Sequence, residues 1–209
     1  MSVLDRVLFF MPSLAFRRHA AVTLANAVAP QQAAPLWQRA CALQVELSRK
    51  RPRYGCGLNL LMRYMEWSAA FYGALREAGF SEHSAGQMVE ATNWAAIGPA
   101  SALSFRFSRV ASSNPVVRGR WITDRLFGFL FTAPFRRVTY DAPAEIAFDV
   151  LACPLAQYFK ERRLPELTRY AACSLDHHMA RQWGLVLQRQ TTIANEFPLC
   201  DFRFRIQKG

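Results

Sequence analysis

Glu145-Ile-Ala-Phe-Asp-Val-Leu-Ala152 alternates apolar and polar side chains, which is typical of a β-strand with one buried face. The stretch before it, Phe135-Arg-Arg-Val-Thr-Tyr-Asp141, alternates in the same way and is rich in strand-forming residues. Residues 142–144 read Ala-Pro-Ala, as expected of a turn. We therefore predict a β-hairpin over residues 135–152 that buries Ile146, Phe148 and Val150.

The residues that follow predict two helices and a second hairpin. Helical sequence runs over 154–162 and 165–183, and Gly184 then precedes a predicted strand over 185–194. A turn containing Pro198 leads to a last alternating strand over 200–206. The order is hairpin, helix pair, hairpin, which makes a small four-stranded antiparallel sheet.

The chain before residue 135 has helical periodicity. Apolar residues recur every three or four positions over 33–49 and 58–78, and Ser81 can cap a further helix that we expect to break at Gly98-Pro99. Two more helices are expected over 100–110 and 120–131. The predicted fold class is α+β, with the helical N-terminal two thirds (1–134) packed on the sheet region (135–209) as one compact unit.

The charge of the chain is strongly positive but unevenly distributed. The 209 residues carry 26 basic and 15 acidic groups, a net charge of +11, and only three of the basic residues are lysine. Residues 1–140 hold 17 basic and seven acidic groups, whereas residues 141–209 hold nine and eight. The densest run, Arg49-Lys-Arg-Pro-Arg53, lacks the interleaved aromatic residues of a nucleic-acid groove, so no nucleic-acid partner is expected.

The N-terminal segment is apolar without being long enough to cross a membrane. Pro12 interrupts its apolar run, and Arg17 and Arg18 follow where a signal peptide is uncharged, so we predict an amphipathic helix in a cytoplasmic protein. Weak peripheral membrane contact through this helix is a possible role for Val7, Phe9, Phe10, Leu14 and Phe16. The five cysteines are odd in number and widely spaced, which argues against a secreted disulfide framework.

Most candidate reactive residues lie in the last sixty positions. Cys153-Pro154 ends a strand and begins a helix, where the positive helix terminus is expected to lower the thiol pKa. Cys173 and Asp176 share one helix face, although an Asp there can also simply pair with an arginine such as Arg189 or Arg203.

Two further features concern the closing strand and metal binding. Cys200 and Asp201 open that strand, and alternation sends their side chains to opposite faces. A metal site can be drawn from Cys153, Cys173, His177 and Cys200, but no tight ligand pair supports it, so neither metal nor other cofactor is predicted.

Five short motifs in order resemble the L-2-amino-thiazoline-4-carboxylic acid hydrolase family. They are the Cys153-Pro154 helix start, Leu164-Pro-Glu-Leu167, Cys173-Ser-Leu-Asp176, Arg189-Gln-Thr-Thr192 and Cys200-Asp-Phe202, within about residues 145–206. The resemblance implies hydrolysis of a cyclic carbon–nitrogen system: water adds to the amidine-like carbon of a thiazoline, and the ring opens to an N-carbamoyl cysteine.

Such a reaction needs a nucleophile or base, a donor for developing charge, and a cation for the substrate carboxylate. We assign Cys153, Cys173 and Asp176 as the catalytic candidates, Thr191 and Thr192 as donors, and Arg189 as the clamp for an anionic small-molecule substrate. Cys200 and Asp201 either complete this substrate site or hold the hairpin.

Two other classes of function stay open. One is a noncatalytic small-molecule-binding or sensor domain of the 4-vinyl-reductase type, whose apolar cavity is expected to be lined by Trp94, Phe105, Phe127 and Phe148. The other is a basic protein that binds an anionic surface through the arginines of residues 1–140. The oligomeric state does not follow from the sequence.

Overall fold

A computed structural model describes residues 3–49 and 51–206, and contacts divide the chain into two compact units between Ala96 and Ile97. The first unit is helical, and it comprises α1 (Val3–Ala27), α2 (Pro30–Arg49), α3 (Cys56–Glu77) and the first part of α4 (Glu82–Phe107). The helices expected over 33–49 and 58–78 are confirmed as α2 and α3. The sequence-based division between residues 134 and 135 stays a prediction about domain organisation.

Aromatic side chains fill the interior of the first unit around α3. Phe16 is fully buried, and its ring packs edge-on against Tyr64 and Phe71 and stacks on Trp67. Phe16 is therefore unavailable for the membrane contact suggested from the sequence, whereas Leu14 is 48% exposed. Val7, Phe9 and Phe10 lie outside the residues whose side chains are described. No helix within 3–49 and 51–206 is long and apolar enough to cross a membrane.

The sequence predicted a helix break at Gly98-Pro99, and this prediction is wrong. Helix α4 continues to Phe107 with Pro99 inside it. Contacts from the second unit's own residues hold the helix on both sides of the proline. The side chain of Gln182 donates to the carbonyl of Gly98 at 3.1 Å, and the Trp183 indole donates to the Ser101 hydroxyl at 3.2 Å. Tertiary contacts here outweigh the local preference for a break.

The second unit combines helices with the sheet. Helix α5 (Pro115–Phe129) begins five residues earlier than expected because Asn114 caps it, accepting the Val116 N–H at 2.8 Å. The remaining elements are as follows: β1 (Arg136–Tyr140), β2 (Glu145–Ala152), α6 (Pro154–Glu161), a π-helical turn (Arg169–Cys173), α7 (Ser174–Gln182), β3 (Leu185–Gln188) and β4 (Cys200–Ile206).

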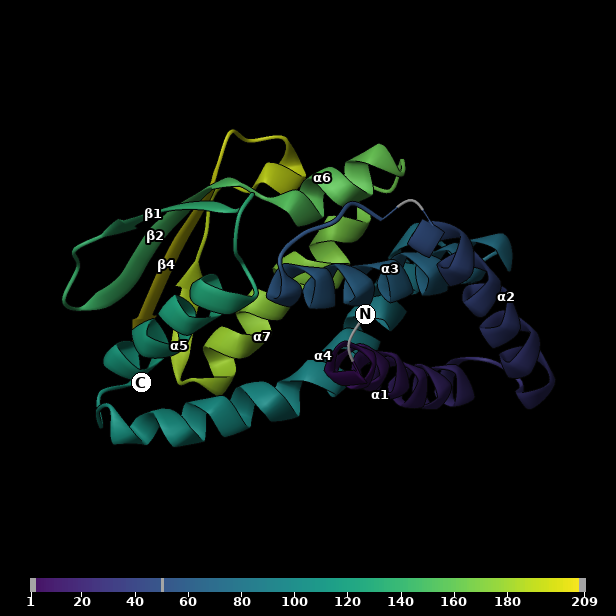
Figure 1. Ribbon diagram of the computed structural model, residues 1–209, viewed down its shortest axis with the longest axis horizontal. Coiled ribbons are helices and arrows are strands. Elements are labelled where there is room, and N and C mark those ends of the chain that lie inside the picture. The colour runs from purple at the N-terminus through teal and green to yellow at the C-terminus, as the bar shows by residue number, and fades with distance from the viewer. Residues whose placement is uncertain (1–2, 50, 207–209) are drawn as a thin grey trace. The chain divides into compact units, whose positions relative to one another are not determined.

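The four strands form one antiparallel sheet in the order β1-β2-β4-β3, which confirms the α+β class. Helices α5 and α7 lie on one face of this sheet (Figure 1), and the core of the unit is between them and the strands. The register places Ile146, Phe148 and Val150 of β2 opposite three β4 residues, Phe204, Phe202 and Cys200, on this face. The predicted burial of these three β2 side chains is confirmed.

The third strand is shorter than predicted, since β3 ends at Gln188 rather than at Ala194. Beyond it, the backbone N–H groups of Gln190 and Thr191 donate to the Asp201 carboxylate instead of to a neighbouring strand. A 3-10 turn (Ile193–Asn195) follows, and Glu196 then adopts a φ of 65°. The alternation of sequence over 185–194 did not reveal that a side chain takes over these backbone donors.

Candidate functional site

An ion pair between Asp176 and Arg189 lies at the centre of the candidate site. Asp176 is in the first turn of α7, and Arg189 directly follows β3. Arg189 Nη1 donates to Asp176 Oδ2 at 2.7 Å, and its Nη2 donates to the Cys173 carbonyl at 2.9 Å. The guanidinium also lies 4.9 Å from the centre of the Phe202 ring. Of the two arginines named as partners for Asp176, Arg189 is the one found.

The two partners of this pair differ in exposure. The Arg189 side chain is only 5% exposed, whereas that of Asp176 is 24% exposed. With both of its terminal nitrogens engaged inside the protein, Arg189 is placed to orient Asp176. The Asp176 carboxylate is therefore held in one orientation, and its side chain as a whole is only partly buried.

Burial and charge act in opposite directions on Asp176. Removal from water raises its pKa, and the charge and hydrogen bond of Arg189 lower it, with the net result above the ordinary value for an aspartate. A carboxylate with a raised pKa is a stronger base than a carboxylate with the ordinary pKa of an aspartate. The chemistry to which this pair is suited is therefore that of a general base.

Three cysteines lie close enough to Asp176 to be affected by its charge, which contributes to raising the pKa of each thiol. Cys153 is the N-cap of α6, Cys173 ends the π-helical turn, and Cys200 begins β4. The Ile193 N–H donates to Cys200 Sγ at 3.2 Å. The structure therefore brings together five of the predicted site residues, namely Cys153, Cys173, Asp176, Arg189 and Cys200.

The expectation of a lowered pKa for Cys153 is wrong, because burial outweighs the effect of the helix terminus. Burial raises that pKa to about 12, and the N–H groups of Ala156 and Leu155 at the start of α6 only partly offset the loss of water. Burial likewise raises the pKa of Cys173 and of Cys200. At neutral pH these side chains are therefore thiols, and none is a preformed thiolate nucleophile.

The backbone is irregular directly before Asp176. Residues 169–173 form a π-helical turn, which changes to the α-helix at Ser174. Such turns insert one extra residue into a helix and occur often at functional sites. The irregularity sets the positions of Cys173 and of its carbonyl, which is the second acceptor for Arg189.

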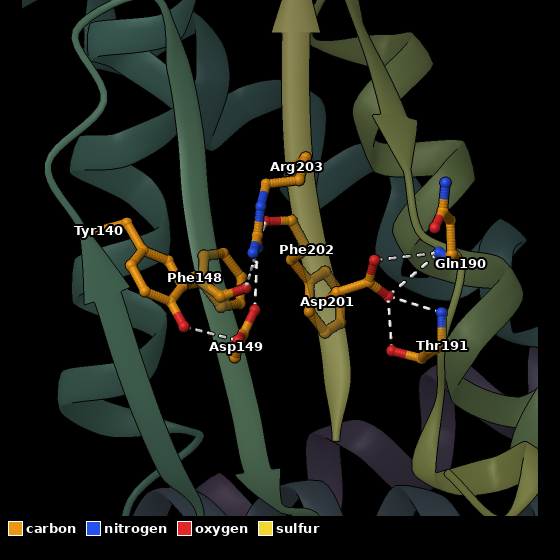
Figure 2. A network of polar contacts seen from close by, with 8 residues as sticks. All are labelled: Tyr140, Phe148, Asp149, Gln190, Thr191, Asp201, Phe202 and Arg203. Carbon is orange, nitrogen blue, oxygen red and sulfur yellow. Dashed lines mark hydrogen bonds and ion pairs between the residues drawn. The ribbon is translucent and has the colours of Figure 1, made fainter. Parts of the chain in front are cut away.

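Asp201 and Thr191 lie together on the other side of β4, away from the core face that holds Cys200. Figure 2 shows the Asp201 carboxylate directed at the segment after β3. It accepts the Thr191 N–H at 2.6 Å, the Thr191 hydroxyl at 2.8 Å and the Gln190 N–H at 3.0 Å. Thr192 caps the 3-10 turn by accepting the Asn195 N–H at 3.2 Å. These contacts give Asp201, Thr191 and Thr192 roles in holding the segment that carries Arg189.

A second polar network on the same outer face was not identified from the sequence. Asp149 on β2 accepts the Tyr140 hydroxyl at 2.7 Å and Arg203 Nη1 at 2.9 Å, and it is 8% exposed (Figure 2). The same Arg203 nitrogen also donates to the carbonyls of Phe148 and Phe202. Alternation along two neighbouring strands is the signal that could have found this network, because it places Asp149 and Arg203 on one face.

The residues considered for a metal site and for an aromatic cavity are arranged differently from those two expectations. Within 3–49 and 51–206, no group of three or more His, Cys, Asp and Glu side chains could hold a metal ion. The aromatic rings proposed to line a cavity pack in the core instead: Phe127 lies edge-on to Phe148 at 5.5 Å, and Phe105 stacks on Trp183 at 5.9 Å. Trp94 belongs to the first unit.

A known family model matches most of the second unit and part of the first. The family model described as L-2-amino-thiazoline-4-carboxylic acid hydrolase matches residues 65–204, which is more than half of the chain. The chain belongs to this family. The thiazoline hydrolase family match contains all eight predicted site residues and extends to β4. No curated protein matches the chain.

Proposed function

We propose that the protein is a hydrolase that opens a small cyclic C–N/C–S compound by addition of water. The observation that carries the proposal is the Asp176–Arg189 pair, in which Arg189 fixes a carboxylate of raised pKa in place on a side chain that is 24% exposed. Membership of the thiazoline hydrolase family supports the class of reaction. The substrate class we infer is an anionic 2-amino-thiazoline carboxylate or a close analogue.

In the proposed mechanism Asp176 is the general base. Its carboxylate removes a proton from a water molecule as the water oxygen attacks the amidine-like ring carbon. As the oxygen adds, the electron pair of the C=N bond moves to the ring nitrogen, which takes up the proton that Asp176 removed. The tetrahedral intermediate then loses its ring C–S bond as its hydroxyl passes its proton through Asp176 to the leaving sulfur, and the carbon becomes a carbonyl. One water is consumed, and an N-carbamoyl cysteine with a free thiol is formed.

Arg189 is a positioning residue in this mechanism rather than the clamp for the substrate carboxylate. Both of its terminal nitrogens already have acceptors, Asp176 Oδ2 and the Cys173 carbonyl. Its fixed positive charge lowers the pKa of Asp176 and so opposes the effect of burial, which still leaves that pKa above its ordinary value. The net charge of +11 favours the approach of an anionic substrate over longer distances.

The thiols of Cys153, Cys173 and Cys200 supply a partly apolar surrounding for the carboxylate. Because burial keeps them protonated, they act as small hydrophobic groups with weak S–H donors. Five free cysteines suit a reducing compartment, so we place the activity in the cytoplasm.

One observation favours a second candidate function, a noncatalytic small-molecule-binding domain. The three thiols at the site are all protonated, so any catalysis depends on Asp176 alone as a base. If Asp176 does not act as a base, the protein is a binding domain whose site holds the ring compound and leaves it unchanged.

A ring-opening assay by mass spectrometry separates the two candidates. With 2-amino-thiazoline-4-carboxylate as substrate, Asp176→Asn should lower kcat by at least about a hundredfold, since a general base contributes that much or more. Asp124→Asn is the matched control, because that aspartate also pairs with an arginine but its side chain is 52% exposed. Binding without turnover in the unaltered protein supports the binding domain, and equal turnover in all three proteins removes Asp176 from the mechanism.

A further inference from the structure

The end of α4 carries an apolar stripe that faces solvent. Leu103, Phe107 and Val110 are spaced by four and three residues and so lie on one helical face, which the 3-10 turn Ser108–Val110 extends. Their exposed fractions are 53%, 64% and 86%. Large apolar side chains clustered at such exposure commonly mark an interaction surface.

The opposite side of the same helix end is fixed to the second unit. Phe105 stacks on Trp183, and the Trp183 indole donates to Ser101. Arg118 from α5 lies over the Phe105 ring at 3.7 Å and donates to the Phe105 carbonyl and to the Ser108 hydroxyl. The stripe is therefore presented by a rigid support and is not a frayed helix end.

Positive charge surrounds the stripe. Arg106 and Arg109 are exposed beside the three apolar side chains. The sequence contains no aspartate or glutamate between Glu90 and Asp124, and Asp124 itself pairs with Arg137 at 2.8 Å. This stretch is thus apolar and basic, with no acidic side chain inside it.

This combination fits an anionic lipid surface better than a partner protein. Stable protein interfaces bury roughly 800 Å² on each side and use about 20–30 residues, far more than three side chains and two arginines offer. A membrane interface accepts a few Phe, Leu and Val side chains between its headgroups, and its phosphates bind flanking arginines. We propose that Leu103, Phe107 and Val110, with Arg106 and Arg109, dock the protein on an anionic membrane surface.

Vesicle sedimentation tests this proposal with the full chain. Vesicles of phosphatidylcholine containing phosphatidylserine should bind the protein at low salt, and vesicles of phosphatidylcholine alone should not. Arg106→Gln with Arg109→Gln should weaken binding about 30-fold, since each arginine near such a surface contributes about a factor of five. Phe107→Ser with Val110→Ser should weaken it about tenfold or more.

Two matched double variants serve as controls. Arg17→Gln with Arg18→Gln removes the same charge from an exposed part of α1, and Val138→Ser with Val186→Ser removes exposed apolar side chains from the sheet. Both should bind like the unaltered protein, and circular dichroism should show that all four variants fold. The proposal is overturned if the unaltered protein ignores anionic vesicles, if the stripe variants bind normally, or if the control variants lose as much binding.

Discussion

Asp149 and Asp201 are register partners on β2 and β4, and each carboxylate accepts hydrogen bonds from its own set of donors. Asp149 is held by Tyr140 and Arg203, whereas Asp201 is held by Gln190 and Thr191 (Figure 2). Two like charges in opposite positions would destabilise a strand pair without such donors. The sheet thus depends on polar contacts on its outer face as well as on the core.

Asp201→Asn should destabilise the protein at neutral pH. Burial raises the pKa of Asp201, but the hydrogen bonds from Thr191 and Gln190 outweigh it and hold the pKa below its usual value. A depressed pKa gives stability that is present above about pH 4 and is lost as the pH falls through the lower folded-state value. We expect a loss of about 1–2 kcal/mol at pH 7, because a charged acceptor of several bonds is replaced.

Urea unfolding at pH 7 and at pH 3 measures this effect. The difference between Asp201→Asn and the unaltered protein should shrink at the lower pH, because pH 3 lies below the ordinary pKa of an aspartate, where the stability that comes from the lowered pKa of Asp201 is partly lost. Asp124→Asn serves as control, since its exposed ion pair should contribute little. An equal loss of stability at both pH values would show that the charge of Asp201 is unimportant.

The activity should fall at low pH, with a midpoint above the ordinary pKa of an aspartate. Asp176 must be ionised to act as a base, and burial raises its pKa despite Arg189. Removal of Arg189 takes away the groups that lower this pKa, so Arg189→Gln should move the acidic limb of kcat/KM to still higher pH. Arg189→Lys keeps a positive charge beside Asp176, so its acidic limb should lie between those of Arg189→Gln and the unaltered protein. If the midpoint is the same in Arg189→Gln as in the unaltered protein, Arg189 does not influence the pKa of the catalytic base.

Alkylation should distinguish the cysteines by their surroundings. Cys56 is exposed, whereas burial raises the pKa values of Cys153, Cys173 and Cys200. At pH 8 iodoacetamide should therefore label Cys56 more than about tenfold faster than these three in the folded protein, and all should react at similar rates in denaturant. Peptide mass spectrometry reports the order. Early labelling of Cys153 would mean that a thiolate is present at the site after all.

Gly119→Ala should destabilise the second unit through overpacking. A Cβ at this position in α5 lies 2.7 Å from Ile146 Cδ1 and 3.3 Å from Leu185 Cδ1, both in the core. We expect a loss of about 1–3 kcal/mol, reported by the thermal midpoint. Gly128→Ala is the control in the same helix, because nothing lies within 4 Å of its Cβ. That change should be neutral or stabilising by up to about 1 kcal/mol.

The alternation of residues 145–152 and 200–206 determined two strands with their bounds and their buried faces, because side chains on a strand point to its two sides in turn. The Cys-Pro and Cys-x-x-Asp motifs likewise predicted the candidate residues Cys153, Cys173 and Asp176 and the family of the chain. Local patterns of this kind depend only on nearby residues, so the sequence is sufficient for them.

Only the tertiary structure decided how the site residues are used. Whether Asp176 pairs with Arg189 or with Arg203, and whether Asp201 faces a substrate or the backbone of residues 190–191, depends on segments that are distant in the chain. The same holds for the pKa of Cys153, since a helix terminus is visible in the sequence but the loss of water around the thiol is not. Burial is a property of the packed fold, and it reversed the chemistry that the local pattern predicted for this cysteine.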